Sequence, residues 1–175
     1  TAIHAQVWQT QDPNFLYKTT PYNVICPNAT DAWTFGFEVD SATQYYTEVN
    51  YTLSRTTNSG ETWESITFPH TEPGYFSCLS ASSGDVAWIS YVDYSEGNKL
   101  LQTVDGGLTW TQLPVYLGVW INLAHLFDEN KGVTMGDPDS LGFEIHTTLD
   151  GGASWTRVDN NNIPAALPDE YAFAG

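Results

Sequence analysis

Acidic side chains are the most numerous groups in this sequence that could act in catalysis. The chain has 21 Asp and Glu residues against 5 Lys and Arg, which gives a net charge of −16. Two carboxyl groups roughly 5–10 Å apart can hydrolyse a glycosidic bond, and oxygen ligands can hold Ca²⁺. Asp137, Asp139 and Glu144 form the densest acidic group, and Asp137 and Asp139 are the candidates for a weak calcium site. A solvated acidic loop is the alternative, and no other cofactor is expected.

The histidines and cysteines give weaker indications of chemistry. His4, His70, His125 and His146 show no H-x-x-H or H-E-x-x-H spacing, so no zinc or copper site is expected. His125 falls on a predicted inner strand, where a hydrogen-bonded core histidine is the favoured interpretation. The sequence has no G-x-S-x-G elbow, phosphate loop or dinucleotide fingerprint. Cys26 and Cys78 are either two free thiols or a disulfide.

One eight-residue motif occurs three times and indicates what most of the sequence builds. Segments 56–63, 103–110 and 148–155 share the pattern T-x-[DN]-[GS]-G-x-[TS]-W, with 47 positions from Asn58 to Asp105 and 45 from Asp105 to Asp150. An Asp or Asn side chain accepts hydrogen bonds from the backbone N–H groups that follow it, and Gly supplies the positive φ of a tight turn. The Trp anchors the outgoing strand in the core. Each motif therefore predicts a hairpin corner, built by Thr56, Asn58, Gly60 and Trp63, by Thr103, Asp105, Gly107 and Trp110, and by Thr148, Asp150, Gly152 and Trp155.

Short strands flank each motif and predict an all-β protein. Before the motifs lie the segments 31–36, 85–91 and 131–136, each preceded by another short apolar segment, and one more strand follows each Trp. Four strands in a repeat of about 40–50 residues are typical of a β-propeller blade. We therefore expect three full blades of four antiparallel strands, at 21–68, 73–115 and 117–160.

The three motifs resemble the Asp-box (BNR) repeats of sialidase-like β-propellers, sortilin-type receptors and photosystem II assembly-factor propellers. The resemblance covers almost the whole chain. It is nearest to secreted propeller domains of Bacteroidota-like bacteria, through the strings at 127–138 and 162–171. It implies that the motifs lie at the turn between the third and fourth strands of each blade, where they are structural and take no part in catalysis. The first motif departs from the pattern, because Asn58 and Ser59 replace Asp-Gly.

The resemblance also sets an expectation for the size of the ring. A closed propeller of four to eight blades needs about 180–360 residues, so the 175 residues are expected to form a single partial propeller, half of a ring of six to eight blades. Residues 1–20 are expected to hold an outermost strand, Val7–Gln11, without a blade of its own, and residues 161–175 to begin a fourth blade. In a closed ring the N-terminal strand would complete the last blade. The remainder of the propeller, or another chain, is expected to complete the ring.

The amino-acid composition limits the classes of partner that the protein can bind and indicates its location. Nucleic-acid binding is excluded because it requires clustered Lys and Arg, and the longest apolar stretch, 115–127, is shorter than the roughly 20 residues of a membrane span. Strong negative charge favours a secreted, extracellular or cell-surface protein, and Ala5–Gln6 fits a signal-peptide cleavage point. Ser41 and Ser140 lie in Asp-Ser-aliphatic sequences that resemble the O-glycosylation sites of secreted Bacteroidota proteins. Unmodified polar loops are the alternative.

These observations favour a non-catalytic module that binds a protein or a glycan, or acts as a scaffold. Tyrosines on the predicted loops 40–50 and 92–98 are candidate contacts: Tyr45, Tyr46, Tyr51, Tyr91 and Tyr94. The alternative is a sialidase-like glycoside hydrolase whose catalytic residues lie largely in a missing half. Such an enzyme needs three arginines around a carboxylate, and only Arg55 and Arg157 occur here. An assembly factor for a membrane complex is a third interpretation, although the photosystem version relies on an Arg-rich patch that this chain lacks.

Overall fold

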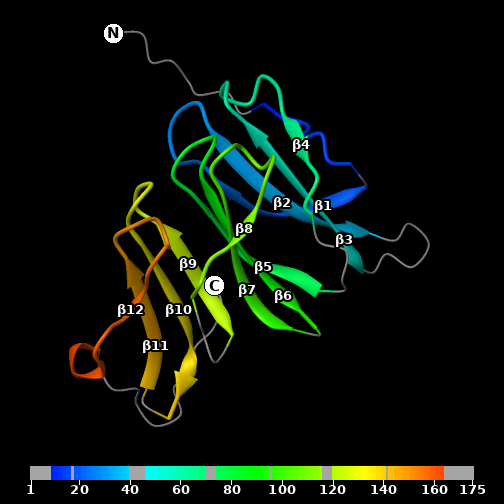
Figure 1. Ribbon diagram of the computed structural model, residues 1–175. Helices are drawn as coiled ribbons and strands as arrows, with labels where there is room; N and C mark the ends of the chain where they lie inside the picture. The colour runs from blue at the N-terminus through cyan, green and yellow to red at the C-terminus, as the bar shows by residue number, and fades with distance from the viewer. Residues whose placement is uncertain are drawn as a thin grey trace, which may run out of the picture.

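Each repeat forms one four-stranded antiparallel sheet in the computed structural model (Figure 1). The structure describes residues 9–16, 18–39, 46–69, 74–94, 96–115, 120–140 and 142–163. In every sheet the strands are hydrogen-bonded in sequence order. The predicted all-β class and the four-stranded antiparallel repeat are therefore confirmed.

The three sheets have the same order of elements. The first contains β1 (Thr19–Ile25), β2 (Ala32–Val39), β3 (Tyr46–Thr56) and β4 (Glu64–Ile66). The second contains β5 (Gly74–Ala81), β6 (Ala87–Asp93), β7 (Gly97–Thr103) and β8 (Thr111–Gln112). The third contains β9 (Ile121–Leu126), β10 (Gly132–Asp139), β11 (Gly142–Thr148) and β12 (Thr156–Arg157), followed by a short 3₁₀ helix η1 (Asn160–Asn162).

Strand register makes the sheets equivalent residue by residue. The Thr that opens each motif pairs with the small residue that opens the second strand: Ala32 with Thr56, Ala87 with Thr103, and Gly132 with Thr148. One position further along, Trp33 pairs with Arg55, Trp88 with Gln102, and Val133 with Thr147. Positions in one sheet can therefore be compared directly with positions in the next.

The second sheet lies between the first and the third, and a hydrophobic core fills each interface (Figure 1). In the first interface Trp33 and Phe35 pack with Phe76 and Ile89. The second core includes Trp88 and Leu100 of the second sheet with Ile121, Ala124 and Leu126 of the third. Full burial of a large apolar side chain contributes about 1.5–3 kcal/mol, so packing between the faces of the sheets dominates the stability of the arrangement.

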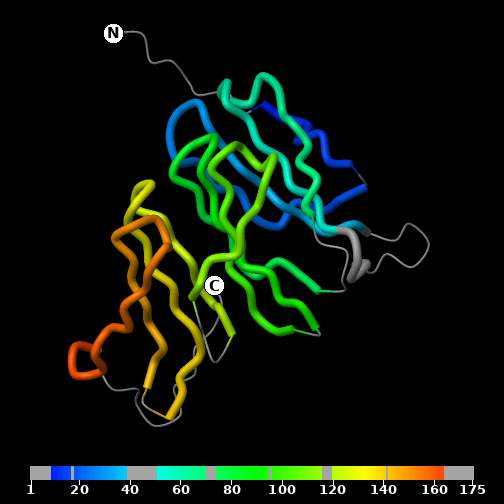
Figure 2. The backbone as a smooth tube through the Cα atoms, viewed as in Figure 1, coloured from blue at the N-terminus to red at the C-terminus, as the bar shows by residue number. Residues whose placement is uncertain are grey.

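Turns gather at two ends of the sheets. The three motifs and the turns between the first and second strands lie together at one end, here called the motif end (Figure 2). The second strands end and the third strands begin at the opposite end. Among the described residues no helix is long and apolar enough to cross a membrane.

The two ends of the chain are described only in part. Of the strand predicted at Val7–Gln11, the first two residues lie outside the described part of the chain, and residues 9–11 carry no strand assignment. Segment 9–16 lies beside the last strand of the first sheet, where the Asn14 side chain donates to the Trp63 carbonyl at 3.3 Å and the Ser65 hydroxyl donates to the Asn14 carbonyl. The predicted start of a fourth blade lies outside the described residues from 164 onward.

Candidate functional site

The three motifs use their polar groups to close their own turns. In each, the Thr hydroxyl donates to the Asp or Asn side chain at 2.8–2.9 Å and accepts from the Gly N–H at 2.8–3.0 Å. The same side-chain oxygen accepts from the backbone N–H four residues on, at 2.9–3.0 Å. One further N–H joins each motif to the neighbouring turn: Ser59 donates to Thr30, Gly106 to Asp85 and Gly151 to Asn130, at 2.7–2.9 Å.

The hydrogen bonds keep the two motif carboxylates ionised. The Ser154 hydroxyl donates to Asp150 at 2.6 Å, and this bond, with the Ser154 N–H, lowers the pKa of Asp150 to about 2. The Thr109 hydroxyl, donating at 2.6 Å, likewise lowers the pKa of Asp105. A general acid needs the opposite shift, so this geometry suits a structural turn.

An arginine holds the acidic group of the third sheet. Arg157 donates to both carboxylate oxygens of Asp139, at 2.7 and 3.0 Å, and lies 4.0 Å from the buried Glu144. The Asp137 carboxylate accepts from the Asn122 amide at 2.6 Å. Asp139 and Asp137, the candidates for calcium, thus have different partners, and among the described residues no cluster of three His, Cys, Asp or Glu is placed to hold a metal.

The other arginine joins the first sheet to the second. Arg55 donates to the Gly84 carbonyl at 2.6 Å and forms ion pairs with Asp85 at 3.0 Å and Glu64 at 3.2 Å. Its guanidinium also lies over the Trp33 ring, 5.9 Å from the centroid. Arg55 and Arg157 therefore belong to different sheets, and each is engaged by neighbouring acids.

The cysteines are free thiols, and the register corrects the predicted equivalence between them. Cys26 follows β1, is exposed, and corresponds to Ala81 of the second sheet; Cys78 lies inside β5 and is buried. Burial raises the pKa of the Cys78 thiol to about 11. The structure therefore does not join the two residues that were candidates for a disulfide.

Several other candidates can be placed, and some lie outside the described residues. Ser140 is exposed at the turn after β10, whereas Ser41, Tyr45, His4 and His70 are not described. The expectation that His125 is a core residue is wrong: it is exposed on β9, and its ring lies 4.8 Å from that of Phe127. Tyr91 is buried in the first core and Tyr51 packs beside it. Of the predicted tyrosine contacts whose side chains are described, only Tyr94 is largely exposed.

An aromatic cluster lies at the end opposite the motifs. Tyr75 is the second residue of β5, Tyr94 follows β6, and Trp120 precedes β9, so the cluster spans the boundary between the second and third sheets. The Tyr75 ring lies 5.2 Å from that of Trp120 and 6.0 Å from that of Tyr94, which is 55% exposed. We call these three residues the aromatic end. Of these three residues, the sequence analysis named only Tyr94. Tyr75 lies near it through the pairing of β5 with β6, and Trp120 meets Tyr75 only through the packing of the second sheet on the third.

Acidic groups border the aromatic end. Lys99 of β7 forms ion pairs with the buried Asp93 at 2.9 Å and with the exposed Glu96 at 2.6 Å. On the other side, the Asp137 N–H donates to the Trp120 carbonyl at 3.1 Å. Many protein recognition surfaces combine aromatic rings, which offer an apolar face, with charged groups around them.

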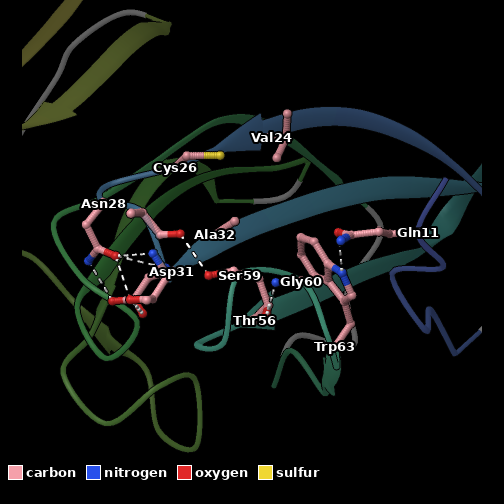
Figure 3. A pocket seen from close by; sticks show the side chains of 12 residues that line it. Gln11, Val24, Cys26, Asn28, Asp31, Ala32, Thr56, Ser59, Gly60 and Trp63 are labelled. Atoms are coloured by element: carbon pink, nitrogen blue, oxygen red, sulfur yellow. Dashed lines mark hydrogen bonds between the residues drawn. The ribbon is translucent and has the colours of Figure 1, made fainter. Parts of the chain in front are cut away.

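A pocket opens at the motif end, on the face of the first sheet that points away from the second (Figure 3). Its volume is about 240 Å³. Val24, Cys26 and Ala32 line one side, and the first motif lines the other with Gly60 and Trp63. The indole nitrogen of Trp63 donates to the Gln11 side chain at 3.3 Å.

Comparisons with known proteins support the fold. No protein-family profile matches the sequence, and no curated protein matches it. YCF48 bound to a D1 peptide is similar in structure, with a TM-score of 0.57 and 22% identity over 89% of this chain and 44% of that chain. YCF48 from Cyanidioschyzon merolae has a TM-score of 0.52 and 21% identity, over 81% of this chain and 38% of that chain. The GH74 enzyme from Niastella koreensis has a TM-score of 0.54 and 16% identity, over 77% of this chain and 22% of that chain.

These similarities concern architecture. The chain spans less than half the length of each of these three proteins. At such identities the likeness shows the fold alone. Together with the three four-stranded sheets, it establishes that this chain is built of β-propeller blades.

Proposed function

We propose that this chain is part of a propeller that binds a protein segment through the aromatic end and does not catalyse a reaction. The observation that carries the proposal is the cluster of the half-buried Tyr75 and Trp120 with the exposed Tyr94, bordered by Glu96 and Asp137. Tyr and Trp give large contact areas at a low entropic cost. A net charge of −16 favours a basic partner over an acidic one.

Two of the comparisons bear on the class of ligand. One similar structure is YCF48 bound to a peptide, which supports a protein ligand. Another is a GH74 enzyme, so a glycan is the second candidate, because sugar rings also stack on aromatic side chains. A sialidase-like activity has less support, since both arginines of this chain are engaged by acids in separate sheets.

The experiment compares two double variants in one screen. Wild type, Tyr94→Ala/Trp120→Ala and the control Leu108→Ala/Leu149→Ala are tested on a basic-peptide array and a neutral-glycan array. Leu108 and Leu149 are 81% and 77% exposed and lie in the motifs at the other end. We expect peptide binders of wild type to be retained by the control and weakened about tenfold or more by the aromatic-end variant.

Three outcomes would contradict the proposal. Binders that survive in Tyr94→Ala/Trp120→Ala would place recognition elsewhere, and binders found only on the glycan array would change the ligand class. Hydrolysis of sialosides or aryl glycosides by purified wild type would favour the enzyme alternative.

We also propose that the three motifs are Asp boxes and that the protein is secreted or displayed at the cell surface. The pattern of threonine, carboxylate and glycine hydrogen bonds supports the first statement. The acidic composition and the exposed Ser140 support the second. Mass spectrometry of the native protein tests it, with a glycan expected on the peptide that contains Ser140.

A further inference from the structure

In both interfaces between sheets, a tryptophan of one sheet packs against the same positions of the next. Trp33, at the second position of β2, packs in one core with Ala87, the first residue of β6. Trp88, at the same position of β6, lies so close to Gly132, the first residue of β10, that a Cβ there would overlap its ring. Each tryptophan also meets the motif Trp of the following sheet: Trp33 and Trp110 have ring centroids 6.5 Å apart, and Trp88 and Trp155 5.3 Å.

The first sheet has an equivalent site for a tryptophan on its other face, which we call the seat. Ala32 opens β2 just as Ala87 opens β6, and it lines the pocket of Figure 3 together with Trp63, the motif Trp of this sheet. Cys26, which corresponds to Ala81 in the first core, lines the pocket as well. No tryptophan of the described residues fills this seat, and Val24 beside it is 59% exposed.

A second feature repeats three times and shows what surrounds the pocket. The last Gly of the second and third motifs lies against a residue from the end of the preceding sheet: a Cβ at Gly107 would lie 2.7 Å from Ile66, and one at Gly152 2.7 Å from Leu113. At Gly60 the residue that a Cβ would overlap is Gln11. In the sequence, Gln11, Ile66 and Leu113 each follow a Trp by three positions. Segment 9–16 thus takes the place of the last strand of a preceding blade.

We propose that the pocket receives a tryptophan from the second strand of a further blade, for which segment 9–16 supplies the outermost strand. The tryptophan would lie on Ala32 and against Trp63, as Trp88 lies on Gly132 and against Trp155. This occupant completes an interface of the kind that the molecule already contains twice.

The third sheet of a second copy of this chain does not present the required side chains. It carries Val133 and Thr147 where the first sheet has Trp33 and Arg55 and the second has Trp88 and Gln102. A head-to-tail dimer would therefore leave the seat without its indole. The occupant is a blade from outside these three sheets, with Trp at the second position of its second strand.

The native thiol of Cys26 allows a direct test. The whole chain is equilibrated, under thiol exchange, with a disulfide that carries an indol-3-yl-ethyl, a phenylethyl or a hydroxyethyl group, and labelling of Cys26 is measured by peptide mass spectrometry. Cys78 is buried and is the internal control. We expect the exchange constant for the indole group to exceed that for hydroxyethyl by about tenfold, with phenylethyl between them.

Two variants connect that preference with the pocket. Ala32→Phe fills the seat, and Val24→Asp places a carboxylate on its exposed rim, where a folding defect is not expected. In both variants the exchange constant for the indole group should fall to that for the hydroxyethyl group. Leu108→Ala, in the second motif, should leave the exchange constants unchanged. An indole preference below twofold, or one that persists in Val24→Asp, would overturn the proposal. A concentration-dependent dimer that Val24→Asp abolishes would also overturn it, because a second copy would then be the occupant.

Discussion

The indole nitrogen of Trp33 donates a hydrogen bond to the carbonyl oxygen of Ser83 at 2.8 Å, across the boundary between the first and second sheets. Trp33 is fully buried, and Ser83 lies in the turn between β5 and β6. The same turn is held from the first sheet by Asp31, whose carboxylate accepts from the Gly84 N–H at 2.8 Å. Neighbouring blades are thus joined by directed hydrogen bonds in addition to the apolar core.

The matched variants Trp33→Phe and Trp88→Phe separate the hydrogen bond from the packing. Both lose a similar ring volume, but the Trp88 indole nitrogen has no partner among the described residues. Only Trp33→Phe takes the donor away from the half-buried Ser83 carbonyl, and loss of such a hydrogen bond costs about 0.5–1.5 kcal/mol. We expect urea unfolding to show Trp33→Phe as the less stable by this amount. Equal losses would mean that the bond contributes nothing.

Gly107→Ala and Gly97→Ala test the contact between the second motif and the preceding sheet. Both glycines have positive φ, 90° and 87°, so an alanine at either position costs about 1–2 kcal/mol in backbone strain. A Cβ at Gly97 meets nothing within 4 Å, whereas one at Gly107 meets Ile66. We expect Gly107→Ala to lose about 1–3 kcal/mol more in thermal or urea unfolding. If Gly97→Ala is equally destabilised, the contact with Ile66 is unimportant.

Asp150 should give the protein part of its acid sensitivity. The pKa of Asp150 is lowered to about 2, so the folded state favours the ionised carboxylate. The stability that this provides is complete above the unfolded value of about 3.8 and is lost as the pH falls toward 2. We expect Asp150→Asn to reduce the fall in melting temperature between pH 4 and 2. A fall as steep as that of wild type would contradict the assignment.

The first motif predicts which substitution at Asp150 is tolerated. Asn58 accepts from Thr56 and from the Thr62 N–H, and its amide nitrogen donates to the Thr62 hydroxyl at 2.8 Å. Asp150→Asn can form the same bonds, whereas Asp150→Ala forms none of them. At pH 7 the melting temperature of Asp150→Ala should therefore be clearly the lower. Equal melting temperatures would show that the side chain does not hold the turn.

Thiol labelling should distinguish the two cysteines. The thiolate is the reactive form, and burial raises the pKa of Cys78 to about 11 while Cys26 is exposed. With a maleimide at pH 7.5 we expect one rapid modification, at Cys26, and a second only after unfolding. No modification in the folded protein, with recovery of two thiols after reduction, would indicate a disulfide.

The sequence was sufficient for the local architecture because its repeat encodes the turns. In each motif the Thr hydroxyl and the side chain of the Asp or Asn bond to groups within four positions along the chain, so the spacing predicts both the corner and the strands that flank it. Placement of Asp150 and Asp105 in turns follows directly from this chemistry.

Contacts between sheets were not predictable in the same way. Trp33 and Ser83 are 50 positions apart, and Tyr75 and Trp120 meet only because the second and third sheets pack face to face. The mistaken interpretation of His125 has the same origin, since period-2 alternation does not tell which face of a sheet meets a neighbour. The aromatic end and the pocket could therefore be located only after the register was known.

Nuclear Overhauser contacts between glycine and methyl protons test the arrangement of consecutive blades most directly. With selectively labelled Gly, Ile and Leu, the account predicts cross-peaks from the Gly107 Hα protons to the Ile66 methyls and from the Gly152 Hα protons to the Leu113 methyls. Each pair joins one sheet to the next. If both sets of cross-peaks are absent from a folded sample with dispersed β-sheet amides, the sheets do not pack as successive blades.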